Sequence, residues 1–255
     1  MLTFLRKVRK SLIDTGSTRR YLLYAIGEIA LVVIGILIAL QINNWNEHRK
    51  LESRSLEYLQ RLKVDLDNVS RDVNGSMMDT ERKFHQAQVA FEALETKELT
   101  PNKREDFENH LKEYYQFSIT IQNTPAYHEM LSSGDLGLLK NEWLRTAFAD
   151  LSEARDFLME VNQSNHNAYK NNKELIEKHV RYHIRNFDTD STKFDVTYDF
   201  DAMTNDDLFI NQISNDVYIW YDIFRMYKRY ERRVHRIQDS IQVELKKYDS
   251  LFFDK

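Results

Sequence analysis

Apolar residues fill one segment near the N-terminus almost completely. Residues 21–42 read YLLYAIGEIALVVIGILIALQI, in which only Glu28 and Gln41 are plainly polar. As a helix this segment spans about 33 Å, enough to cross the roughly 30 Å hydrocarbon core of a bilayer. A buried helix of a soluble protein is rarely apolar on every side for this length. A cleaved signal peptide has a shorter apolar core and an A-x-A-like exit. The pattern therefore predicts an uncleaved transmembrane signal anchor.

Beyond this segment, the spacing of apolar residues is that of long helices. Leu59, Leu62, Leu66, Val69 and Val73 follow one another at steps of three and four, as in the seam of a coiled coil. Residues 186–204 break the helical pattern, and residues 194–201 within them alternate between aromatic or aliphatic and polar side chains, which predicts one short extended crossing segment. The remaining pattern predicts helices over residues 46–99 (a stalk continuing from the anchor), about 102–122, 141–185 and 205–251.

Together these elements predict an all-α fold. We expect a transmembrane helix that continues into an elongated antiparallel bundle of about four long helices. Composition agrees, because 2 prolines and 6 glycines in 255 residues are too few for the turns of an all-β protein. No Gly-rich phosphate loop occurs. With no cysteine in the chain, disulfides, thiolate metal sites and a cysteine nucleophile are excluded.

The charges that flank the apolar segment predict its orientation. Residues 1–20 carry six basic residues and one acid, Asp14, which gives a net charge of +5. Positive residues favour the cytoplasmic side, so residues 1–20 are expected to form a basic cytoplasmic tail and residues 43–255 to lie outside the cytoplasm. Subtracting this tail and Glu28 from the total of −4 leaves −8 for residues 43–255, which argues against nucleic acid as a partner.

Two sequence blocks resemble a known family. The run YLLYAIGEIALVVIGILIALQINNWNE, with the basic tail before it, and the later block SSGDLGLLKNEWLR at Ser132–Arg145 resemble bacterial single-pass membrane-anchored proteins of unknown function. The resemblance implies an anchor in the bacterial inner membrane and a periplasmic helical-bundle domain over residues 43–255. It implies no activity, so no catalytic residue follows from it.

Glu28 is the one acid inside the apolar segment, and such residues are candidates for function. On a helix it shares a face with Val32, Gly35 and Ala39, and Gly35-x-x-x-Ala39 is a spacing that lets two helices approach closely. Three interpretations remain open. The face forms helix–helix contacts, Glu28 snorkels toward the cytoplasmic headgroups, or Glu28 couples the protein to the proton-motive force.

A second candidate group lies on the expected helix over residues 141–185. The regular spacing places Asn165, Asn172 and His179 on its seam. Polar seam residues usually set register or oligomer state, and the alternative is a small polar cavity that binds a ligand. His179 and His183 also have the i, i+4 spacing of metal ligands, but Arg181 and Arg185 lie nearby and disfavour a cation. We therefore expect no metal site.

The last helix combines basic and aromatic residues. Its basic positions interleave with tyrosines, a tryptophan and a phenylalanine, and include Arg225, Arg229, Arg232 and Arg236. In a cytosolic protein this pattern favours nucleic-acid binding. Outside the cytoplasm, a solvated basic face that pairs with acidic helices is the better interpretation, with an anionic partner or membrane surface as the alternative.

No arrangement of residues indicates catalysis or a cofactor, so we expect a protein that is not an enzyme. The leading hypothesis is a membrane-anchored periplasmic scaffold or protein-interaction module. Its expected partners are membrane lipid, itself as a homo-oligomer and another inner-membrane or periplasmic protein. The alternatives are a periplasmic sensor that binds an effector and signals through a partner, and a proton-coupled subunit that uses Glu28.

Overall fold

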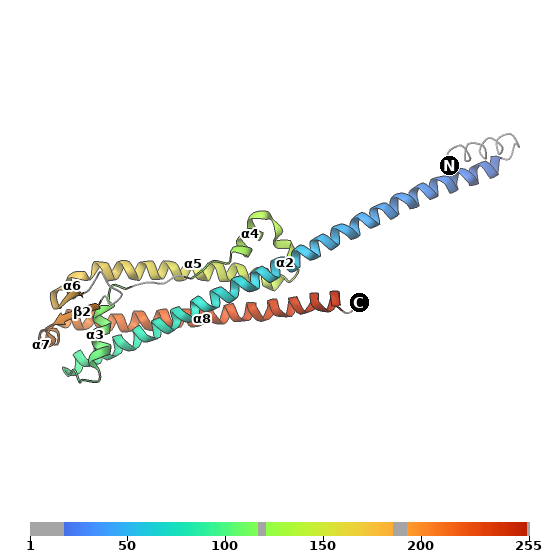
Figure 1. Cartoon of the computed structure of the whole chain (residues 1–255). Coiled ribbons are helices and arrows are strands. Elements are labelled where there is room, and N and C mark those ends of the chain that lie inside the picture. The colour runs from blue at the N-terminus through green and yellow to red at the C-terminus, as the bar shows by residue number, and fades with distance from the viewer. Residues whose placement is uncertain (1–17, 117–120, 186–192, 254–255) are drawn as a thin grey trace. The chain divides into compact units, whose positions relative to one another are not determined.

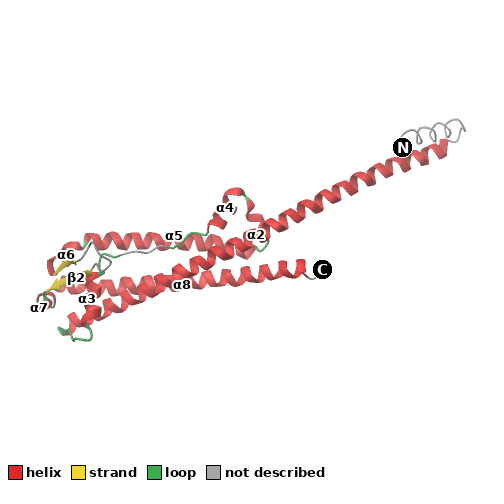
Figure 2. Ribbon diagram, in the orientation of Figure 1, coloured by secondary structure: helices red, strands yellow, loops and turns green. Residues whose placement is uncertain are grey.

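The computed structural model describes residues 18–116, 121–185 and 193–253 (Figure 1). It is mostly helical, with one small two-stranded hairpin (Figure 2). The chain divides into two compact units, residues 1–55 and 56–255. The longest helix, α2, runs from Thr18 to Thr96 and contributes to both units.

The described part of the first unit is residues 18–55 of α2, which include the apolar segment. Its large aliphatic side chains from Leu22 to Ile42 are all exposed, from 46% for Val33 to 73% for Leu31. Burial in a protein core therefore does not account for their hydrophobicity. The helix is long and apolar enough to serve as a membrane anchor or a signal sequence.

The second unit is built on three long helices: the remainder of α2, α5 (Glu142–Asn171) and α8 (Asp207–Phe253). α8 runs antiparallel to α5, because Asn141 contacts Glu244 at one end and Asn172 contacts Gln212 at the other. It also runs antiparallel to α2. Gln238 donates a hydrogen bond to Asp67, and the Lys83 ammonium lies 5.0 Å from the Trp220 ring centroid.

The apolar seams form the core of this unit. All five seam residues predicted between Leu59 and Val73 are 0–3% exposed. They share one hydrophobic cluster with residues of α5 and α8, such as Leu151 and Tyr227. A second cluster forms around Leu94, Phe107 and Phe209. Burial of these side chains is the main favourable contribution to folding, at about 25 cal/mol per Å² of apolar surface.

Short elements connect the long helices. They are α3 (Arg104–Lys112), α4 (Pro125–Ser133), the 3₁₀-helix η1 (Asp135–Leu138), α6 (Lys173–His179) and α7 (Phe200–Met203). The helix expected over residues 102–122 is therefore much shorter. The chain leaves it in a turn, where the Tyr114 N–H donates to the Leu111 carbonyl. This turn buries Tyr114, which is 2% exposed.

The extended crossing segment is confirmed over residues 193–198, whereas residues 200–203 form α7 and residues 186–192 lie outside the described residues. The strand has a partner that the helical pattern concealed. Strand β2 (Lys193–Tyr198) pairs antiparallel with β1 (Val180–Arg185), which places Val180 opposite Tyr198 (Figure 2). The prediction of helix up to residue 185 was therefore wrong for the last six residues. Val180, Tyr182 and Ile184 are β-branched or aromatic residues at a spacing of two, which suits a strand.

Candidate functional site: a buried polar network and an open groove

The innermost polar group of the described structure is a carboxylate on α8. Asp216 is completely buried and lies 3.3 Å from the Nε2 atom of His110, which is 4% exposed. Gln212 donates to the Asp216 carboxylate at 2.9 Å and accepts from the Asn172 amide at 2.8 Å. Side chains from α3, α8 and the α5–α6 junction therefore form one buried network.

Two tyrosines complete the surroundings of this carboxylate. Tyr114 and Tyr169 are each 2% exposed, and their ring centroids lie 4.8 Å apart. Burial raises the pKa of Asp216, although His110, Tyr169 and Gln212 lower it in part. Burial and the nearby Asp216 charge raise the pKa of both tyrosines. The network therefore resists ionisation, since a charged group is costly away from water.

Sequence reasoning missed Asp216, because two seams with the same spacing fit α8. The buried seam of α8 runs through Phe209, Ile213, Asp216, Trp220, Ile223 and Tyr227, at alternating steps of four and three. A second seam with the same alternation contains only apolar residues, so hydrophobicity favours it; it consists of Ile213, Val217, Trp220, Phe224 and Tyr227. The structure instead buries Asp216 and leaves Val217 half-buried.

The predicted polar layer of Asn165, Asn172 and His179 does not form one layer. Asn172 belongs to the buried network, whereas Asn165 is half-buried and the neighbouring Asn162 is the buried asparagine of α5. The seam of α5 is displaced here, because Asn162 and Tyr169 are buried while Ala168 is exposed.

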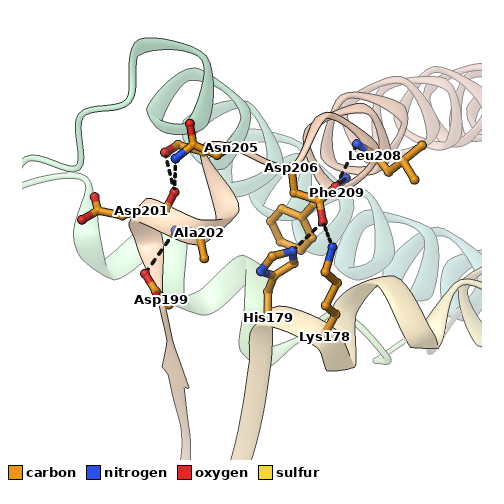
Figure 3. Close-up of polar contacts among 10 residues, drawn as sticks. Lys178, His179, Asp199, Asp201, Ala202, Asn205, Asp206, Leu208 and Phe209 are labelled. Carbon is orange, nitrogen blue, oxygen red and sulfur yellow. Dashed lines mark hydrogen bonds and ion pairs between the residues drawn. The ribbon is translucent and has the colours of Figure 1, made fainter.

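His179 instead lies at the end of α6, facing the start of α8 (Figure 3). Its Nε2 atom is 2.7 Å from the Asp206 carboxylate, and the Lys178 ammonium is 2.5 Å from the same oxygen. The other oxygen of Asp206 accepts from the backbone N–H groups of Leu208 and Phe209, which is the geometry of an N-cap. Hydrogen bonds from Lys178 and His179 hold the pKa of Asp206 well below its usual range.

The strand also separates the two histidines that have metal-ligand spacing. His183 lies on β1, where its Nε2 atom is 3.0 Å from the Thr197 hydroxyl. Within the described ranges, no group of three or more His, Asp or Glu side chains has a geometry that could hold a metal ion.

The predicted basic face of α8 borders a groove. Arg225, Arg229, Arg232 and Arg236 are all exposed. A pocket of about 510 Å³ between α5 and α8 is lined by Asp150, Glu153, Ala154, Phe157, Leu158, Met226, Arg229, Tyr230 and Arg233. A smaller one of about 210 Å³ lies beside it and shares Asp150 and Arg233, with Trp143 and Arg236 also in its lining. We call these two pockets the α5/α8 groove.

The predicted membrane face also lies on the surface of its own unit. Val32, Gly35 and Ala39 are exposed, and Glu28 is half-buried. A side chain added at Gly35 would meet nothing within 4 Å. This face is therefore open to a neighbouring helix.

The second recurring sequence block has a structural role. It forms the end of α4, η1 and the start of α5. Gly134 closes α4 in a left-handed conformation with φ of 77°. Asp135 accepts hydrogen bonds from Tyr58 and Ser133. Asn141 caps α5 by accepting from the Leu144 N–H, and its amide donates to Glu244 of α8.

Residues 28–215 match the model of a family of unknown function, DUF6090. The chain belongs to this family. The matched region begins at Glu28, includes the α4–α5 block and ends next to Asp216. No curated protein matches the chain, and no solved structure matches it either. Family membership therefore assigns no activity to the chain.

Proposed function

We propose that this protein is a membrane-anchored helical interaction module, with residues 21–42 of α2 as its anchor in the bacterial inner membrane and residues 43–255 in the periplasm. The observation that carries the proposal is the fully exposed apolar surface from Leu22 to Ile42. Leaving so much apolar area in water is unfavourable by about 25 cal/mol per Å², and a bilayer removes that cost. The +5 charge of residues 1–20 supports a cytoplasmic N-terminus.

The mass and location of the mature full-length chain test the anchor. We expect an uncleaved chain that stays with membranes after alkaline carbonate washing, and a C-terminal alkaline phosphatase fusion that is active. A chain shortened after the apolar segment and soluble in the periplasm would identify a signal sequence instead. An inactive phosphatase fusion beside an active cytoplasmic reporter would reverse the topology.

We also propose that the Glu28 face brings copies of the anchor together. Gly35 and Ala39 are small and exposed, which favours close helix packing in a membrane. Gly35→Leu should reduce self-association of the full chain in membranes. Ala30→Leu is the matched control, because position 30 lies about 200° around the helix from Glu28. Equal self-association of the two variants would contradict the proposal.

A second candidate function, binding of a small effector, is favoured by one pocket. It measures about 460 Å³ and is lined by Tyr115, His166, Tyr169, Lys170, Lys173 and Glu177. Tyr169 connects this pocket to the buried network through Asp216. The lysines favour an anionic molecule, so a set of small carboxylates and phosphates should raise the melting temperature of the full chain. The double variant Lys170→Ala with Lys173→Ala should abolish that rise. If none of these small molecules raises the melting temperature, effector binding is rejected and the interaction module remains as the proposed function.

A further inference from the structure

The α5/α8 groove has one acidic and one basic edge. Asp150 and Glu153 line it from α5, and Arg229, Arg233 and Arg236 line it from α8. We call these the acidic edge and the basic edge. Across the described residues, no ion pair neutralises any of these five side chains; Arg229 and Arg233 donate only to backbone carbonyls, of Arg225 and Asp150. The groove thus presents two uncompensated rows of opposite charge.

Apolar surface accompanies these charges. Phe157 lines the groove and is 56% exposed, and Trp143 is 47% exposed at its other end. Beneath them, Leu158 and Tyr230 are buried in the core. Exposed aromatic residues next to arginines are typical of protein–protein interfaces, and the groove lies between two long helices, where another pair of helices can pack.

We propose that the occupant of this groove is the same groove of a second copy of the chain. A uniformly acidic partner would be repelled by Asp150 and Glu153, and a uniformly basic one by the basic edge. A second copy carries both edges. Rotation by 180° about an axis parallel to α5 and α8 places the acidic edge of each copy against the basic edge of the other, as in an isologous interface.

The heights of the charges along the helices match in this arrangement. Arg233 contacts the Asp150 carbonyl within one chain, so these residues lie at one level, and Arg229 and Glu153 line the same pocket. A rotation parallel to the helices preserves these levels. Asp150 of one copy then faces Arg233 of the other, while Glu153 faces Arg229. The result is an antiparallel four-helix bundle, formed by α5 and α8 of each copy.

This inference rests on the proposed function, because a shared membrane holds two copies in the same orientation. The rotation keeps the Leu56 ends of both copies at the same end of the dimer, as such anchoring requires. The groove contact is nevertheless separate from the Glu28 face, since the two lie in different units of the chain. The experiment must therefore report on the groove itself.

Site-specific cross-linking in membranes provides that report. The chain has no cysteine, so Ala154→Cys in one tagged full-length chain and Met226→Cys in a second, differently tagged chain introduce one thiol each. A short bis-maleimide should join the two tags, because both positions line the groove. Val64→Cys paired with Met226→Cys is the control, since Val64 is 58% exposed on α2. Cross-linking no greater than that of the control pair overturns the proposal.

Charge reversal then tests the complementarity. Arg229→Glu with Arg233→Glu leaves Arg236 as the one positive charge of the basic edge, so both edges are then net acidic. Asp150→Lys with Glu153→Lys makes both edges basic. We call these the all-acidic and the all-basic chain. Introduced into both members of the cysteine pair, either change should weaken association about a hundredfold, because like charges then face each other. Mixing an all-acidic with an all-basic chain should restore cross-linking. Lys228→Glu with Arg232→Glu is the matched control, which reverses two charges on α8 outside the groove and should change nothing.

The outcomes separate this inference from the proposed function. If all-acidic chains that retain the wild-type melting temperature cross-link as efficiently as wild type, the charge pairing is rejected. It is also rejected if mixing all-acidic with all-basic chains does not restore cross-linking. Absence of groove cross-links from a complex whose native mass is still a multiple of the chain rejects the groove while leaving the interaction module intact. Cross-links from the groove to a different protein reject the second copy as its occupant.

Discussion

Asp216 is a carboxylate at a position where the α8 seam otherwise places apolar residues. It is tolerated because His110 and Gln212 lie within 3.3 Å and 2.9 Å of its oxygens. Partners of this kind offset only part of the desolvation cost of a buried charge. Such a network favours one alignment of the helices, because any shift in register leaves several buried polar groups without partners.

Substitution of Asp216 should separate hydrogen bonding from charge. Asp216→Leu is expected to lower the free energy of unfolding by about 2–5 kcal/mol, since it removes the buried acceptor of the Gln212 amide N–H and the carboxylate that faces His110. Asp216→Asn keeps the shape and the acceptor for Gln212, so its effect should be much smaller. Chemical denaturation of the full chain in detergent measures both. Equal losses for the two variants would contradict this account of the network.

The raised pKa of Asp216 predicts how the stability of wild type relative to Asp216→Asn depends on pH. A carboxyl group with a raised pKa in the folded state contributes stability below its ordinary pKa, and this contribution disappears as the pH rises through the folded value. Wild type should therefore lose stability relative to Asp216→Asn as the pH is raised from about 4 toward neutrality. A constant difference between the two would show that Asp216 is not the titrating group.

Asp206 behaves in the opposite way, because its pKa is lowered by Lys178 and His179. Its ionised form stabilises the folded chain at neutral pH, and that contribution is lost as the pH falls below the usual range of an aspartate. Asp206→Ala should cost about 1–3 kcal/mol at neutral pH, from the lost N-cap and the lost partners of Lys178 and His179. Asp207→Ala, at an exposed position next to it, is the control. Thermal unfolding between pH 3 and 7 should show the two variants converging in acid.

At the scale of elements, Gly134 connects α4 to η1 in a left-handed backbone conformation that favours glycine. Its φ of 77° closes α4 and directs the chain toward α5. Nothing lies within 4 Å of the position of an added Cβ atom, so the cost of a side chain comes from the backbone alone. Gly134→Ala should lower the free energy of unfolding by about 1–2 kcal/mol.

Gly137→Ala provides the comparison within the same connection. Gly137 also has open space around an added Cβ atom and does not have a positive φ. Its substitution should leave stability unchanged or raise it by about 0.4–1 kcal/mol, because alanine reduces the freedom of the unfolded chain. Urea unfolding of both variants measures the difference. A larger loss at Gly137 than at Gly134 would refute the conformational argument.

The hairpin shows why an element can be misread when its period is ambiguous. Up to His179 the seam follows steps of three and four, and Tyr182 continues that spacing. The same stretch also alternates through Val180, Tyr182 and Ile184, so both periods fit. The pairing with the next segment of the chain decides between them, because β2 supplies the hydrogen-bonding partners that a lone strand lacks.

At the scale of the whole molecule, the proposed groove dimer depends on exposed charges and should therefore weaken with salt. Raising sodium chloride from about 0.05 M to 0.5 M shortens the range of electrostatic attraction from well above 10 Å to below it. Cross-linking between Ala154→Cys and Met226→Cys chains should fall several-fold over this range. Self-association through the Glu28 face should persist, because van der Waals packing in the membrane is not screened. Salt-independent groove cross-linking would contradict an electrostatic interface.

The sequence by itself determined the mostly helical class, the long apolar helix near the N-terminus and the seam of α2, because each depends on residues close together in the chain. The tertiary structure decided which polar residues meet. Asp216 and His110 are more than a hundred residues apart, as are Asn141 and Glu244. It also decided that Arg229 and Arg233 face Asp150 and Glu153 across a groove. Spacing along a helix predicts which face a residue occupies, but only packing determines what lies opposite that face.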